Sequence, residues 1–118
     1  MIRIWLAIAG LGGIASVAAG ALAAHLADDP KAAELLRTGA LYGMIHAAAL
    51  LAVVAIAARR LAVRVAGWGF AAGIVLFSGS LFALAAGGPR WLGWVSPFGG
   101  VALIIGWAAL ATIAVRRR

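Results

Sequence analysis

Four long stretches of this chain contain no Lys, Arg, Asp or Glu, and each has 19 to 23 residues. They cover residues 4–26, 39–58, 65–87 and 97–115. All 10 basic and 3 acidic residues therefore lie in the short segments between and beyond them. A helix with one face in water carries charge every turn or so, whereas a helix that crosses a bilayer needs about 20 apolar residues. The four stretches are predicted to be transmembrane helices.

The composition points to the same fold class. Hydrophobic residues make up 66% of the chain and charged residues 11%, against about 45–50% and about 25% in ordinary globular proteins. So few charged residues cannot cover a water-exposed surface, which excludes a soluble enzyme. The prediction is an all-α fold, an integral membrane four-helix bundle that forms one domain over residues 1–118. The absence of cysteine excludes disulfides, thiolate metal sites and cysteine nucleophiles.

The basic residues predict the orientation of the bundle. With four spans, both termini and the connection between the second and third helices share one side of the membrane. That side carries Arg3, Arg59, Arg60, Arg64, Arg116, Arg117 and Arg118, and the other side carries Lys31, Arg37 and Arg90 with all the acidic residues. Because Lys and Arg are enriched in cytoplasmic loops, both termini are expected in the cytoplasm of a bacterium, with the spans in its inner membrane. The net charge of +7 is thus a topology signal, and no nucleic-acid partner is expected.

The first stretch has an alternative interpretation as a signal peptide. Arg3 precedes an apolar run that ends in small residues before His25, which resembles a cleavage site. The run is longer than the ~7–15 apolar residues usual in a signal peptide, which favours a transmembrane helix. Cleavage before His25 would remove that helix from the mature protein.

The connections between the spans are short and carry helix start and stop signals. Asp29 is placed to cap the second helix, with Pro30 at its first position. Residues 30–38 are predicted to form an amphipathic lead-in at the membrane interface. Residues 87–90 are predicted to turn, and Pro97 is predicted to start the fourth helix.

Small residues recur where helices are expected to pack. Lipid gives no hydrophobic gain for helix association, so close approach of backbones must stabilise the bundle. The candidate packing positions are Gly12, Ser16, Gly20, Gly69, Gly73, Pro97, Gly99, Gly100 and Gly106. They are interpreted as contacts within the chain, with a homo-oligomer face as the alternative. The expected partners are the lipid bilayer and either a second copy or another membrane protein.

Few polar side chains fall inside the spans, and these are the candidates for a site. They are His25, Tyr42, His46, Ser78, Ser80 and Trp107. Tyr42 and His46 lie one turn apart on one helix face, and Trp107 needs a partner for its indole N–H. His46 and Ser80 are expected at a similar depth in the outer half of the membrane. The prediction is a single polar cluster that holds helices together or binds a small ligand or lipid.

Other chemistry for this cluster is less favoured by the residues present. A haem held by His25 and His46 is chemically allowed, but the two histidines are expected at different depths. A transition metal held by two histidines alone would be poorly coordinated, with Asp28 and Asp29 as the nearby carboxylates. A serine hydrolase would need an orienting acid, and no span contains one. Cation transport generally uses an intramembrane carboxylate, for which His46 is the available substitute. No catalytic residue, metal site or cofactor is therefore assigned.

At these positions the chain resembles a known family, the small four-helix membrane proteins of domain-of-unknown-function family 423, related to the eukaryotic transmembrane protein 256 group. The resemblance covers nearly the whole chain. It is carried by residues 20–26, Thr38 and Gly39, Tyr42, residues 46–51, residues 77–81, Pro97, Gly99 and Gly100, and Gly106 and Trp107. The resemblance implies a four-helix inner-membrane protein without an assigned reaction.

The predicted function is that of an uncharacterised, non-enzymatic integral inner-membrane protein. It is expected to be a structural or accessory subunit whose polar cluster binds a small ligand or lipid. One alternative is a small oligomeric transporter or channel component, and a second is a haem protein with two histidine ligands.

Overall fold

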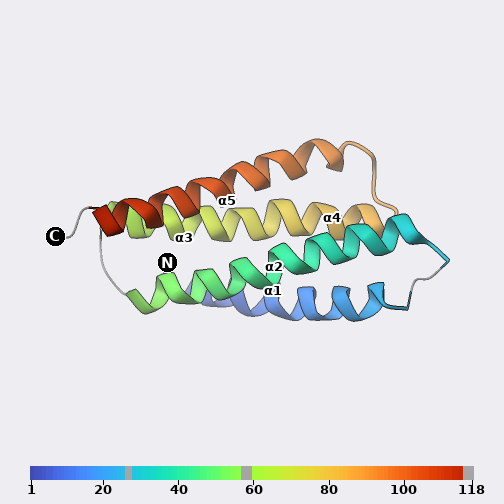
Figure 1. Ribbon diagram of the computed structural model, residues 1–118, viewed down its shortest axis with the longest axis horizontal. Coiled ribbons are helices and arrows are strands. Elements are labelled where there is room, and N and C mark those ends of the chain that lie inside the picture. Colours follow the sequence, from blue (N-terminus) through green and yellow to red (C-terminus); the bar gives the residue numbers. More distant parts are fainter. Residues whose placement is uncertain (26–27, 57–59, 116–118) are drawn as a thin grey trace.

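The computed structural model describes residues 1–25, 28–56 and 60–115. All regular structure in these ranges is helical (Figure 1). The elements are α1 (Ile2–Ala23), α2 (Pro30–Ile56), α3 (Leu61–Gly73), the π-helical turn η1 (Ile74–Ser78), α4 (Gly79–Ala85) and α5 (Leu92–Val115). The predicted span ends at Leu26 and Ala58, and the basic residues Arg59 and Arg116 to Arg118, lie outside the described residues.

The described helices form four rods because α3, η1 and α4 follow one another without a break. The rods Ile2–Ala23, Pro30–Ile56, Leu61–Ala85 and Leu92–Val115 are each long and apolar enough to cross a membrane. This confirms the predicted fold class, an all-α integral membrane four-helix bundle. The connections between the rods are short, as the charge-free stretches indicate.

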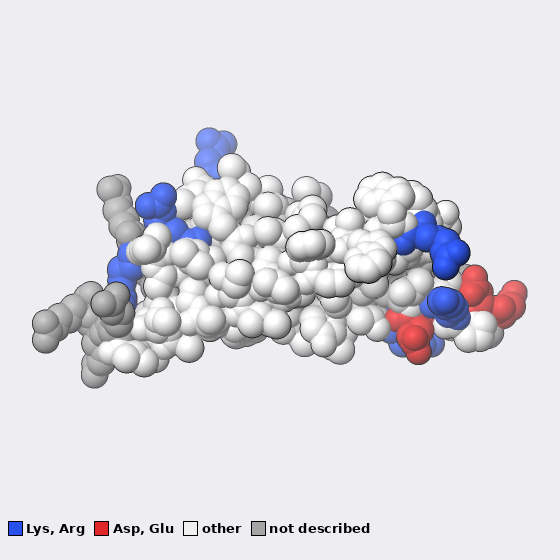
Figure 2. All heavy atoms as spheres, turned by 90° about the horizontal axis from the view of Figure 1, so that it is seen from above, with Lys and Arg blue, Asp and Glu red and all other residues white. Residues whose placement is uncertain are grey.

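Charged side chains gather at the two ends of the elongated molecule, which measures 53 × 24 × 21 Å (Figure 2). Arg3, Arg60 and Arg64 lie at the end that we call the arginine end, where both chain termini are found. The acidic residues Asp28, Asp29 and Glu34 lie at the other end, called the acidic end. The surface between the two ends in Figure 2 is uncharged, as the hydrocarbon of a bilayer requires.

The two rods α2 and α3–η1–α4 occupy the centre of the bundle. α1 packs along α2, α5 packs along α3–η1–α4, and the two central rods pack on each other (Figure 1). Only 22% of the most apolar window is buried in α1 and in α5, against 44% in α2 and 39% in the third rod. The outer rods therefore present most of their surface to whatever surrounds the bundle.

The core changes character along the bundle. Toward the arginine end it contains the large side chains Trp5, Leu50, Val53 and Phe70, which are 0–2% exposed. Toward the acidic end, small residues bring α1 and α2 together, and the buried cluster is Ala19, Ala23, Ala33, Leu36 and Ala40.

The start of α2 is as predicted. Asp29 caps it, since the Ala32 amide donates to Asp29 Oδ1 at 3.2 Å, and Pro30 is its first residue. Residues 30–38, predicted as an amphipathic lead-in, form the first part of α2 itself, with Lys31, Glu34 and Arg37 exposed. Ala33 and Leu36 are buried in the small-residue cluster with α1, which gives the segment a tertiary reason to stay helical.

The predicted turn at residues 87–90 is present and begins with a Schellman motif. The Gly87 amide donates to Leu84 O at 3.1 Å and the Gly88 amide to Ala83 O at 2.8 Å. Gly87 has a φ of 93°, a left-handed conformation that glycine adopts at little cost.

The predicted start of the fourth helix at Pro97 is wrong, because α5 begins at Leu92 and Pro97 lies inside it. A proline within a helix lacks the amide that would bond the carbonyl four residues earlier. That carbonyl belongs to Gly93, close to the helix start. A single lost bond near a helix end is tolerable, and residues 92–96 can therefore precede the proline in the same helix.

Candidate functional site

His46 lies in α2 near the middle of the bundle and is 5% exposed. Its Nδ1 is 2.6 Å from the carbonyl oxygen of Tyr42, one turn earlier on the same helix. The indole Nε1–H of Trp107, on α5, donates to His46 Nε2 at 2.9 Å. This bond supplies the partner that the sequence required for Trp107, and it joins α5 to α2.

The two hydrogen bonds fix the protonation state of His46. An indole N–H can only donate, so Nε2 must accept through its lone pair. A carbonyl oxygen can only accept, so Nδ1 must carry the hydrogen. His46 is therefore a neutral imidazole protonated at Nδ1. Both ring nitrogens are used within the chain, and Nε2 could coordinate a metal only after the Trp107 bond was broken.

Aromatic rings from α2 itself, from α3 and from α5 surround this imidazole. The Tyr42 ring is stacked on it, with centroids 6.0 Å apart and an interplanar angle of 9°. The rings of Phe70 and Trp107 both lie 5.7 Å from it, and these two rings are 5.0 Å apart. The Phe77 ring extends the group by contact with Tyr42 at 4.9 Å. We call Tyr42, His46, Phe70, Phe77 and Trp107 the His46 cluster.

Ser78 and Ser80 bond to other partners. Ser78 donates to the carbonyl oxygen of Gly39 on α2 at 2.8 Å, and Ser80 donates to Phe77 O at 2.9 Å. Ser80 also shares a 2.6 Å hydrogen bond with Ser96 on α5. The two buried serines thus join the third rod to opposite neighbours, as expected for residues two apart on a helix.

The similar depth expected for His46 and Ser80 is wrong. His46 packs on Phe70, and Ser80 lies ten residues beyond Phe70 along the same rod, which corresponds to roughly 15 Å of helix rise. His46 follows the start of α2 by 16 residues, or roughly 24 Å, which places it near the middle of the bundle. The six candidate residues therefore do not form a single cluster.

His25 is the candidate farthest from the others. It follows the end of α1 and is exposed, and its backbone amide bonds to Leu22 O at 3.0 Å. The structure thus places it at the acidic end, whereas His46 lies in the middle of the bundle. Among the described residues there is no group of three His, Cys, Asp or Glu side chains that could hold a metal ion.

The third rod contains a wide turn that the sequence does not reveal. η1 covers Ile74–Ser78, and such π-helical turns are often found at functional sites. Gly99 of α5 lies directly against it, since a Cβ built at Gly99 would lie 2.8 Å from the carbonyl carbon of Leu76. Phe77 and Ser78 leave this turn toward different partners, Tyr42 and Gly39.

The glycines predicted to pack lie mostly against neighbouring helices. Gly69 approaches the carbonyl oxygen of Ala102 and the backbone of Gly106, Gly73 faces Leu103, and Gly12 faces Ile74. Gly20 faces Ala40 at an ordinary distance, and Gly100 faces the ring of Phe77. Ser16 lies against Gly43.

Several residues of these sites were not found by sequence reasoning. Phe70 and Phe77 carry no polar atom and do not differ from other core residues in the sequence. Ser96 stands before a proline, which was interpreted as a helix start.

Two buried groups have no hydrogen-bond partner in the part of the chain that the structure describes, namely Trp5 Nε1 and Ser16 Oγ.

The family described as "Protein of unknown function (DUF423)" matches residues 19–100. The chain belongs to this family. The matched residues contain most of the His46 cluster and both buried serines of the third rod, while Trp107 lies beyond them.

Curated relatives cover almost the full length of the chain. It is 40% identical to the "UPF0382 membrane protein" of Haemophilus influenzae, over 91% of this chain and 90% of the relative. It is 37% identical to the "UPF0382 membrane protein YwdK" of Bacillus subtilis, over 97% and 98%. It is 36% identical to the "UPF0382 inner membrane protein YgdD" of Escherichia coli K12, over 97% and 91%. No solved structure matches the chain. The chain is therefore a multi-pass membrane protein of this family.

Proposed function

We propose that this protein is a non-enzymatic accessory subunit of a bacterial inner membrane, with both termini in the cytoplasm. It binds another integral membrane protein by helix packing, and the His46 cluster keeps its own helices in register for that contact. One observation carries this proposal. The side-chain nitrogens of His46 and Trp107 are bonded to each other and to the backbone of α2, so they act within the chain.

The internal bonds argue against an exchange site for protons or metal ions. An ion carrier would need a group that is free to take up and release its cargo, whereas both nitrogens of His46 are engaged. The four charge-free stretches contain no carboxylate that could take this role. A haem ligated by His46 would likewise have to displace Trp107.

The outward face of α1 is the surface best suited to a partner helix. Gly10 and Gly13 have open space where a Cβ would be, and Ile14 and Val17 are 68% and 62% exposed. These four residues follow the spacing of one helix face. Small residues allow another transmembrane helix to approach the backbone closely, which is the main source of helix association in lipid.

The proposed location and orientation rest on the basic residues and on the relatives. Arg3, Arg60 and Arg64 lie at the arginine end, and the Escherichia coli relative is named an inner membrane protein. Fusions of alkaline phosphatase and green fluorescent protein to the C-terminus and after Arg37 test this orientation. We expect fluorescence without phosphatase activity at the C-terminus and the reverse after Arg37. The opposite pattern would refute it.

Photocrosslinking in native membranes tests the accessory role. A photoreactive amino acid at Ile14 should yield one discrete adduct with a different membrane protein, and a reciprocal probe on that protein should return the adduct. The same probe at Ile104, which is 67% exposed on α5, is the matched control and should label lipid. Self-adducts alone, together with a pH-dependent flux in vesicles, would replace the proposal by a transporter.

A further inference from the structure

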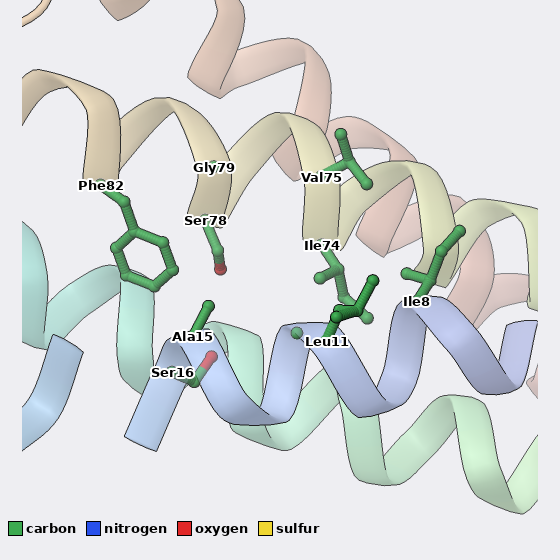
Figure 3. A pocket seen from close by; sticks show the side chains of 10 residues that line it. Ile8, Leu11, Ala15, Ser16, Ile74, Val75, Ser78, Gly79 and Phe82 are labelled. Atoms are coloured by element: carbon green, nitrogen blue, oxygen red, sulfur yellow. The ribbon is translucent and has the colours of Figure 1, made fainter. Parts of the chain in front are cut away.

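A groove opens between α1 and the third rod (Figure 3). α1 packs closely on α2 but touches the third rod only lightly, which leaves a space of about 250 Å³. Its walls are apolar and include Ile8, Leu11 and Ile74. A cavity of about 150 Å³ holds benzene, so this groove has room for a substituted six-membered ring.

Two hydroxyls line one part of this groove. Ser16 is 1% exposed, and its Oγ has no hydrogen-bond partner within residues 1–25, 28–56 and 60–115. Figure 3 shows Ser16 of α1 and Ser78 of the third rod reaching into the same space, beside the ring of Phe82. Ser78 donates its hydroxyl hydrogen to Gly39 O, and this bond does not use the lone pairs of its oxygen. Ser16 Oγ nevertheless makes no hydrogen bond to a described residue, although a buried unpaired hydroxyl costs about 1–3 kcal/mol.

The depth of Ser16 restricts what could satisfy it. It lies seven residues before the end of α1, which is roughly 10 Å below the acidic end. The ester carbonyls of phospholipids stay at the membrane interface, and a plain acyl chain has no acceptor to offer. A charged carboxylate at this depth would be costly. The fitting acceptor is a neutral carbonyl on a molecule that dissolves in the hydrocarbon.

We propose that this groove binds the head group of a lipid-soluble quinone. One ring carbonyl accepts the hydrogen bond of Ser16, the ring lies beside Phe82, and the apolar tail follows Leu11 and Ile8 toward the arginine end. The groove lies outside the His46 cluster, so the inference is independent of the accessory role proposed above.

Binding of decylubiquinone to the full chain in lipid nanodiscs tests this site. We expect saturable binding of one molecule per chain and a lower frequency of one quinone carbonyl band in infrared difference spectra. Ser16→Ala should weaken binding roughly three- to tenfold, the worth of one net hydrogen bond, and should remove the band shift. Because Ser16 Oγ bonds to no described residue, alanine breaks no bond there and the variant is expected to fold.

Two further variants separate the site from general effects. Ser80→Ala removes a buried serine bonded to Ser96, outside the groove, and should leave both affinity and band shift unchanged. Gly79 lines the groove with open space where a Cβ would be, so Gly79→Leu should fill the groove and abolish binding with Ser16 still present. The proposal is overturned by absence of saturable binding, by an unchanged band in Ser16→Ala, or by equal competition from decane.

Discussion

The bond between Trp107 and His46 directly links α5 to α2, and the variant Trp107→Phe tests its importance. Phenylalanine keeps an aromatic ring beside Phe70, whose centroid lies 5.0 Å from that of Trp107. It removes the N–H that His46 Nε2 accepts at 2.9 Å, together with part of the indole ring system. The substitution therefore isolates the hydrogen bond from most of the ring packing.

The expected loss of stability follows from two terms. Hydrogen bonds between helices in membranes contribute about 0.6 kcal/mol on average and about 1.7 at most. Here the substitution also leaves a nitrogen of a 5% exposed imidazole without a donor, which costs about 1–3 kcal/mol in a protein interior. We expect a loss of about 1–2 kcal/mol, which changes the ratio of folded to unfolded protein by roughly 5- to 30-fold.

Reversible unfolding in mixed micelles, followed by circular dichroism, measures this loss. Trp94→Phe is the matched control, because Trp94 is 78% exposed on the same helix. It should change the free energy of unfolding by less than about 0.5 kcal/mol. A double-mutant cycle with His46→Phe should show that the two substitutions are coupled, since they remove the same bond.

The nitrogen resonances of the imidazole provide a second measurement. In ¹⁵N-labelled protein, His46 should show a protonated Nδ1 and an unprotonated Nε2. Trp107→Phe should shift the Nε2 resonance and leave the bond from Nδ1 to Tyr42 in place. The reasoning is refuted if Nε2 carries the hydrogen, or if Trp107→Phe is no more destabilising than Trp94→Phe.

Three further predictions concern helix contacts and use the same unfolding measurement. Gly99→Ala places a Cβ against the backbone of η1, which cannot move aside, and should cost about 1–3 kcal/mol or more, whereas the neighbouring Gly100→Ala should be tolerated because its nearest contact is 3.8 Å away. Gly43→Ala should clash with the hydroxyl of Ser16 and destabilise by about 1–3 kcal/mol, and adding Ser16→Gly should recover part of that loss. Asp29→Ala should lower the free energy of unfolding by about 1 kcal/mol because it removes the cap of α2, while Asp29→Asn should retain most of the stability that the cap contributes. Equal effects within any of these pairs would contradict the contacts on which they depend.

The sequence predicts the architecture of this protein well because the bilayer imposes strong rules. Segments without charge must be helical and about 20 residues long, and four such segments leave little choice of fold. The cap at Asp29 and the turn at Gly87 are also local features, set by a few neighbouring residues. The start of the second helix at Pro30 was predicted in the same way, whereas the burial of Ala33 and Leu36 against α1 depends on tertiary packing.

The candidate site was predicted less well because it depends on how the helices are offset along the membrane normal. Sequence spacing places Tyr42 and His46 one turn apart, and the structure stacks their rings. Sequence spacing gives no information on which residue of the third rod lies opposite His46. That position is occupied by Phe70, while Ser80 pairs with Ser96 nearer the acidic end. A polar residue in a span predicts a need for a partner, but the partner is chosen by the packing of the whole bundle.

The wide turn η1 shows how local and tertiary effects combine in this choice. No proline lies within Ile74–Ser78, so nothing in its composition requires a departure from the α-helix. The turn occurs where Gly99 allows the backbone of α5 to approach that of the third rod. From the same turn, Phe77 reaches Tyr42 and Ser78 reaches Gly39 on α2. A regular helix would give these side chains other directions, because a π-helical turn changes the rotation of every residue that follows it. The geometry at the centre of the bundle therefore depends on a contact between two helices, which neither sequence segment specifies alone.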